Sequence, residues 1–161
     1  MNPKSTQGYQ VYPQSHEGEY NFINAEHVVY DAYFVEASEF FPGNTFATDA
    51  TMFTLEPAGG AEPPEKVDPQ IGPTVADIFT REFTKNPHRI IVYICATEDA
   101  KEMLRVRKFD WMFEKQNMNR LYKKINIKDR VRNISGAIIY AIDNPAETEI
   151  IEAAKRLPLL V

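Results

Sequence analysis

Basic side chains recur at a regular step after the most apolar run of the chain, residues 89–96. Lys101, Arg105, Lys108 and Lys115 stand at i, i+4, i+7 and i+14, so a helix would place them along one side. The basic residues that continue this segment are Arg120, Lys123 and Lys124. A line of cations suits the phosphates of a nucleic acid, but it also describes an ordinary solvated helix face. We expect a solvated face first and an anion-binding stripe second.

A second group of charged residues follows the same apolar run more closely. Glu98, Asp99, Arg105 and Arg107 stand where a central strand would end, and open sheets often bind ligands at such ends. Carboxylates beside guanidinium groups can serve acid–base chemistry or hold a charged ligand. Asp99-x-x-Glu102 also resembles a capping box, in which these acids would simply start a helix. The capping role is the stronger interpretation.

Established catalytic and cofactor motifs are missing from the sequence. There is no Walker loop, no dinucleotide fingerprint, no Gly-x-Ser-x-Gly and no His-Glu-x-x-His. His16, His27 and His88 are not at metal-ligand spacing from one another or from Cys95. Cys95 lies in the apolar run and is expected to pack as a small hydrophobic residue. We therefore predict no catalytic residue, no metal and no cofactor.

The basic stripe needs a helix, which the sequence predicts from about Asp99 to Asn119. Phe109, Phe113, Val106 and Met103 would lie opposite the cations and pack on a sheet, whereas Met112 falls within the arc of the cations. Trp111 is expected at the edge of this core, and a stacking platform for nucleic-acid bases is the alternative.

Strands are predicted on both sides of the central apolar run. Residues 20–24 and 27–41 alternate apolar and polar side chains around a short turn, and residues 50–57 form a third strand. Residues 89–96 are apolar throughout, as in a strand buried on both faces. Two more strands are expected at 121–129 and 134–143.

Two further helices are indicated by capping residues. Thr74 is a candidate N-cap for a helix that Asn86-Pro87 ends, and Asn144-Pro145 predicts the start of a last helix that ends at Pro158. The inward face of that last helix is predicted to carry Ile150, Ile151, Ala154 and Leu157.

The predicted order is β-β-β-α-β-α-β-β-α. It indicates an α+β fold, with a mostly antiparallel sheet of about five to six strands and three helices. We expect residues 1–18 to be a flexible N-terminal tail and residues 19–161 to form a single domain. The segment 57–73, rich in proline and glycine, is predicted to be a long surface connection.

Charge is distributed unevenly along the 161 residues, whose net charge is −5. Residues 1–80 contain 2 Lys/Arg and 12 Asp/Glu, whereas residues 101–132 contain 11 Lys/Arg and 4 Asp/Glu. Such asymmetry can mark a charged partner, although two halves of one domain can also neutralise each other. A single cysteine and the lack of an apolar run of membrane-spanning length favour a cytoplasmic protein that binds no membrane.

Aromatic residues are concentrated in the predicted strand 27–41. The set consists of Tyr30, Tyr33, Phe34, Phe40 and Phe41. These side chains are expected mainly in the core of the sheet, but one on the outer face could serve a partner interface.

Three segments resemble a family of small bacterial proteins described only as a domain of unknown function. They are "DPQIGPTVADIFTREF", "IVYICATEDAKEMLRVRKFDWMF" and "NISGAIIYAIDNPAETEIIEA". The family's motif would fall on Cys95, Glu98, Asp99, Arg105, Arg107, Phe109 and Trp111. The likeness spans most of residues 20–157. It implies a bacterial origin and supplies no catalytic residue.

These observations favour a non-catalytic binding or regulatory domain that acts by contact with another protein or by self-association. A nucleic-acid-binding protein that uses the basic region 101–132 is the alternative. A second alternative is an enzyme whose site lies at the exit of the 89–96 strand.

Overall fold

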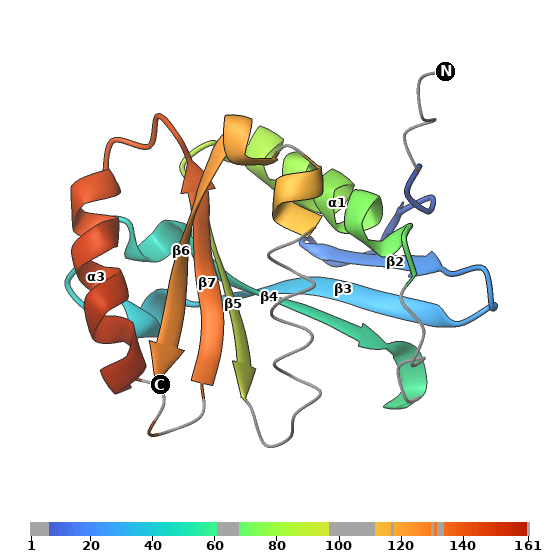
Figure 1. The fold of residues 1–161 in the computed structure, drawn as a ribbon, viewed down its shortest axis with the longest axis horizontal. Helices are drawn as coiled ribbons and strands as arrows, with labels where there is room; N and C mark the ends of the chain where they lie inside the picture. Colours follow the sequence, from blue (N-terminus) through green and yellow to red (C-terminus); the bar gives the residue numbers. More distant parts are fainter. Residues whose placement is uncertain are drawn as a thin grey trace.

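The computed structural model describes residues 7–60, 68–96, 112–116, 118–129, 131 and 134–160. Within these residues seven strands form one sheet in the order β1-β2-β3-β4-β5-β7-β6, and all neighbouring strands except β4 and β5 are antiparallel (Figure 1). The fold is therefore α+β, with a mostly antiparallel mixed sheet, as the sequence predicted.

The first four strands form a meander. They are β1 (Tyr12–Pro13), β2 (Glu19–Ile23), β3 (Val29–Glu36) and β4 (Ala50–Pro57). The turn between β2 and β3 is organised by the Asn24 side chain, whose Oδ1 accepts hydrogen bonds from the amides of Glu26 and Val28. The 3₁₀ turns η1 (Ser38–Phe40) and η2 (Ala47–Asp49) connect β3 to β4, and η3 (Ala58–Gly60) follows β4. The predicted second strand was therefore too long, since it ends at Glu36.

The remaining three strands form the other half of the sheet. They are β5 (Ile90–Ala96), β6 (Tyr122–Asp129) and β7 (Ile134–Ala141). β7 lies between β5 and β6, and Gly136 in its centre leaves room for the neighbouring backbone. A Cβ atom at this position would lie 2.0 Å from the carbonyl oxygen of Tyr93.

Helices pack on both faces of the sheet. α1 (Ile71–Lys85) packs on one face, together with a helical turn at 112–115 and η4 (Met118–Arg120). α3 (Glu147–Leu160) packs on the other face, over β5, β6 and β7. No helix in the described part of the chain is long and apolar enough to cross a membrane.

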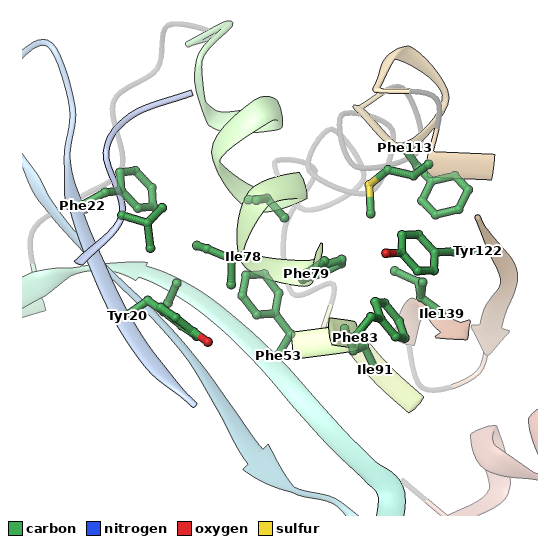
Figure 2. Packing of buried hydrophobic residues seen from close by; sticks show 14 of the residues in the cluster. Tyr20, Phe22, Phe53, Ile78, Phe79, Phe83, Ile91, Phe113, Tyr122 and Ile139 are labelled. Atoms are coloured by element: carbon green, nitrogen blue, oxygen red, sulfur yellow. The ribbon is translucent and has the colours of Figure 1, made fainter. Parts of the chain in front are cut away.

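The larger apolar core lies between α1 and the sheet. Figure 2 shows Ile78, Phe79 and Phe83 of α1 directed at side chains of the strands. Phe79 meets Phe53 edge to face at 4.9 Å between ring centroids, and Phe83 stacks on Tyr122 at 4.3 Å. Burial of each such side chain contributes about 1.5–3 kcal/mol, which is the main reason that α1 holds its position.

The second core lies under α3. Ile138 on β7 and Ile150 and Leu157 on α3 are fully buried there. Ile139, the next residue of β7, is buried in the first core because successive side chains of a strand point to opposite faces. β5 is divided in the same way, with Ile90 and Val92 in the second core and Ile91 in the first. This confirms the prediction that residues 89–96 form a strand buried on both faces.

The N-terminal segment packs against α1. Val11 is buried, and the ring of Tyr9 stacks on Phe22 at 5.8 Å. The Tyr9 amide donates to the Thr74 hydroxyl oxygen at 2.8 Å, and its phenol donates to Asp68 Oδ2 at 2.6 Å. The flexibility expected of residues 1–18 stays a prediction, but residues 9–13 have tertiary contacts that hold them on the domain.

Two helix boundaries differ from the prediction. α1 begins at Ile71, and Thr74 is buried inside its first turn, where its hydroxyl donates to the Gln70 carbonyl. α3 continues beyond Pro158 to Leu160. Asn144 does organise the start of α3, since its Oδ1 accepts a hydrogen bond from the Ala146 amide at 2.8 Å.

The inward face of α3 was predicted correctly at three positions of four. Ile150, Ala154 and Leu157 are buried, but Ile151 is exposed and Ala153 is buried in its place. Asn86 ends α1 as predicted, with its amide bound to the Glu82 carbonyl.

Candidate functional site

Most residues of the two predicted sites lie outside the described part of the chain. This applies to Lys101, Arg105 and Lys108 of the stripe and to Glu98, Asp99 and Arg107 of the strand exit. The same holds for Trp111. Both sites therefore stay predictions.

The described cations of the basic region do not lie along one line. Lys123 and Lys124 are neighbours on β6 and point to opposite faces of the sheet. Lys123 reaches α3, where its Nζ lies 2.7 Å from Glu147 Oε2. Lys124 lies on the other face, over the ring of Phe113 at 5.6 Å.

The other two described members of the stripe are Lys115 and Arg120, and both are exposed. Met112, which shared the predicted arc with the cations, packs against the α1 core beside Gly72. Phe113 is buried in that core, as predicted. The helical turn at 112–115 is thus anchored through both Met112 and Phe113.

A buried carboxylate joins α1 to the first strands. Glu82 is 1% exposed, and its Oε1 accepts a hydrogen bond of 2.5 Å from the Tyr20 hydroxyl on β2. Lys85 Nζ lies 3.3 Å from the same oxygen and donates to the Tyr20 hydroxyl at 2.9 Å. Arg89 Nε lies 3.3 Å from Glu82 Oε2. We call these four residues the Glu82 cluster.

Protonation in the Glu82 cluster follows from these contacts. Burial, followed by the hydrogen bond to Glu82, raises the pKa of Tyr20 above its usual range. The hydrogen bond to the Tyr20 oxygen is the main reason that the pKa of Lys85 is also raised. The phenol thus stays neutral and the ammonium charged at neutral pH. The polar atoms of Glu82 and Tyr20 are used within the cluster, so its evident role is to connect α1 to β2.

A second polar group connects β6, β7 and α3. The hydroxyl of the buried Tyr140 and the ammonium of Lys123 both donate to Glu147 Oε2, at 2.9 and 2.7 Å. The bond from Lys123, followed by the bond from Tyr140, lowers the pKa of Glu147. Burial and the neighbouring carboxylate raise the pKa of Tyr140 well above its usual range. These groups position the start of α3.

Metal binding has no support in the described residues. No group of three or more His, Cys, Asp or Glu side chains among them is arranged to hold an ion. A groove of about 680 Å³ lies between the η1 region and α3, with Phe40, Pro42 and Arg156 in its lining. Its carboxylate Glu149 is bound to the amide and the hydroxyl of Thr45, which ties the groove walls together.

The half of the sheet formed by β2, β3 and β4 has one face that belongs to neither core, except at Ala50 and Met52 of β4, which pack with the second core. Tyr20, Phe22, Tyr30, Ala32 and Phe53 point to the α1 core, so the residues between them point the other way. We call that surface the open face, and its members used below are Ile23, Val29, Asp31, Tyr33, Val35 and Glu56.

Large apolar side chains on the open face are exposed to solvent. Val35 is 52% exposed, Ile23 49% and Val29 37%. Ile23 and Val29 lie directly opposite each other on β2 and β3, so they form one continuous apolar spot. Tyr33 lies between this spot and Val35 along β3, and its hydroxyl donates to Glu56 Oε1 at 3.2 Å.

The outer-face aromatic residue that the sequence suggested is Tyr33. Tyr30 and Phe41 are buried, while Phe34 and Phe40 pack against the two cores. Alternation along β3 places Tyr33 opposite to Tyr30 and Phe34, but it does not say which of the two faces a helix covers. The sequence pattern could not identify the uncovered face, because that depends on where α1 and α3 pack.

Comparison with known proteins adds a family but no function. No curated protein and no solved structure matches this chain. A family model described as a family of unknown function, DUF6169, matches residues 67–156, which is more than half of the chain. The match covers α1, β5, β6, β7 and most of α3, while the open face lies on strands outside it. The chain thus belongs to the DUF6169 family.

Proposed function

We propose that this protein is a non-catalytic binding domain that acts by contact with another protein through the open face. The observation that carries the proposal is the exposure of Ile23, Val29 and Val35 on sheet positions that neither helix covers. Exposed apolar side chains are common when they are single, but adjacent ones on a flat surface are typical of a protein contact.

The composition of the open face also fits a protein interface. Tyr33 lies among the apolar residues, and tyrosine is enriched among residues that dominate binding energy. Its ring offers apolar area, while its hydroxyl is already oriented by Glu56. Burial of such a surface stabilises a complex by about 25 cal/mol for each Å² of apolar area, before the cost of association.

Nucleic-acid binding remains the alternative, through the basic region 101–132. The open face itself would repel phosphates, because it carries Asp31 and Glu56 and no basic residue. Among the described cations of the region, Lys123 and Lys124 point to opposite faces of β6, so they would contact different ligands. An enzyme at the exit of the 89–96 strand also stays a prediction.

A capture experiment tests the proposal. The immobilised protein is exposed to lysate of its source cells, and the bound proteins are quantified by mass spectrometry. A double variant, Ile23→Ser with Val35→Ser, is expected to lose the partner that the wild-type chain retains. The matched control carries Leu121→Ser with Ile151→Ser, two exposed apolar residues that lie away from the open face.

The result has two clear outcomes. Loss of one partner in the open-face variant, with retention in the control, supports the proposal once circular dichroism shows that both variants are folded. Capture of the same proteins by all three chains would refute it.

A further inference from the structure

The register of the open face brings two carboxylates together. Asp31 on β3 and Glu56 on β4 are direct cross-strand partners in the antiparallel ladder. Like charges in this relationship destabilise a sheet. Tyr33 donates to Glu56, but a neutral phenol does not cancel either charge.

Four acidic residues of the domain have a cationic partner that neutralises them. Glu82, Glu147, Asp77 and Glu152 each lie beside a lysine or an arginine. Asp31 and Glu56 have no such ion pair in the described residues. The sequence explains why, since residues 7–60 contain eight Asp/Glu and no Lys or Arg.

The apolar residues flank this acidic pair on both sides. Along β3 the outward positions read Val29, Asp31, Tyr33 and Val35, a distance of about 20 Å from end to end. Each step between them is about 7 Å, which equals the spacing of alternate side chains in an extended peptide. A partner whose alternate side chains are apolar and cationic would meet each of these positions with a suitable group.

From this arrangement we infer that the open face binds a segment of a partner protein that carries arginine or lysine between apolar residues. The inference rests on the proposed function and adds the chemistry of the partner. The cation lies between Asp31 and Glu56, where arginine can donate to both carboxylates and stack on the ring of Tyr33. The flanking apolar groups of the partner pack on Ile23, Val29 and Val35.

A second copy of this chain is a weaker occupant. Its exposed cations include Arg120 in η4 and Lys128 on β6, and neither lies on the open face. Contact between them and the open face would join two different surfaces, and such contacts propagate from copy to copy unless a ring closes. A separate cationic segment satisfies the same charges without that constraint.

The test uses a defined peptide. A fluorescein-labelled peptide with the repeat Val-Ser-Arg-Ser, the valine–arginine peptide, presents valine and arginine in turn on one side of the extended chain. It is titrated with the full chain, and binding is followed by fluorescence anisotropy. We expect saturable binding that weakens about tenfold in a double variant, Asp31→Asn with Glu56→Gln. Binding should also weaken as salt rises from about 0.05 M to about 0.5 M, because the Debye length shortens.

Three controls test whether binding depends on the acidic pair, on the charge of the peptide and on its apolar residues. Glu39→Gln with Asp143→Asn removes the same net charge from exposed positions elsewhere and is expected to leave binding unchanged. The same peptide with glutamate in place of arginine should not bind, and the peptide with serine in place of valine should bind more weakly than the valine–arginine peptide. Circular dichroism melting confirms that each variant is folded.

The outcomes separate this inference from the proposed function. The inference is overturned if the wild-type chain and the Asp31→Asn, Glu56→Gln variant bind the peptide with equal affinity. It is also overturned if neither chain binds the peptide. If the lysate partner still depends on Ile23 and Val35, the proposed function survives that result. Self-association that the same charge-neutral variant abolishes, without peptide binding, would assign the open face to a second copy and overturn the inference as well.

Discussion

The Tyr20 hydroxyl on β2 donates a hydrogen bond of 2.5 Å to the carboxylate of Glu82 on α1, and Glu82 is almost completely buried. The two residues are 62 positions apart in the sequence. The bond therefore joins the first strands to the helix that covers them. A buried carboxylate costs much free energy unless its oxygens are bound by donors. The stability of the domain should therefore depend on the hydrogen bond from Tyr20.

Tyr20→Phe should destabilise the protein by about 1–3 kcal/mol, because Glu82 Oε1 loses its shortest hydrogen bond while it stays buried. Urea unfolding measures the change in the free energy of unfolding. Tyr12→Phe is the control, since Tyr12 is exposed and should tolerate the change. Equal stability of Tyr20→Phe and wild type would mean that Lys85 and Arg89 suffice to hold the carboxylate.

Asp31→Asn should raise the free energy of unfolding by roughly 0.2–1 kcal/mol, because it removes one of two like charges that face each other across β3 and β4. Urea unfolding at low salt measures the gain, and Asp143→Asn serves as an exposed control outside the sheet ladder. A gain in stability together with a loss of peptide binding would show that Asp31 lowers the stability of the sheet but contributes to binding of a cationic partner. A loss of stability would contradict the expected repulsion.

Gly136→Ala should destabilise the protein by about 3 kcal/mol or more, since the new methyl group would overlap the Tyr93 carbonyl oxygen and force β5 and β7 apart. Thermal unfolding provides the measurement. Gly43→Ala is a useful comparison, because Gly43 has a φ of 79° and nothing lies within 4 Å of a Cβ there. That variant should lose only the roughly 1–2 kcal/mol of a left-handed conformation. Similar losses in the two variants would contradict the overlap.

Stability should fall on acidification as Glu147 becomes protonated. Its pKa in the folded protein is lowered, chiefly by Lys123, so its contribution is present above the unfolded value and is lost as the pH falls through the folded value. The affected window thus begins near the ordinary glutamate pKa of about 4.3 and extends below it. Lys123→Gln should weaken this dependence and move the Glu147 pKa upward in a carboxyl NMR titration. Lys155→Gln, which changes an exposed pair on the outer side of α3, should leave the Glu147 pKa unchanged.

Local patterns in the sequence predicted much of the fold. The bounds of β4 at 50–57 and the central position of residues 90–96 follow from alternation and from a continuous apolar run. Asn86-Pro87 and Asn144-Pro145 mark helix ends because proline and asparagine act on their own backbone. These features depend on neighbours in the sequence and not on the rest of the domain.

Tertiary partners account for the failures. Thr74 resembles an N-cap, but its hydroxyl accepts a hydrogen bond from Tyr9 and donates to Gln70 inside the helix. Ile151 has the more apolar side chain, yet Ala153 is buried instead, because position 153 stands at i+3 from Ile150 and so lies on the inward face of the helix. The open face could not be predicted either, because alternation defines two faces of a strand without saying which one stays uncovered.

Only three residue pairs join β4 to β5: Ala50 with Ile90, Thr51 with Ile91, and Met52 with Val92. This short parallel ladder connects the meander of β1 to β4 with the part of the sheet that the family model matches. A fragment that begins at α1 would leave the backbone N–H and C=O groups of Ile90–Val92 without their β4 partners, and such edges recruit strands from other molecules. In the full chain the meander pairs with this stretch of β5, so we expect the fragment to aggregate more readily than the full chain.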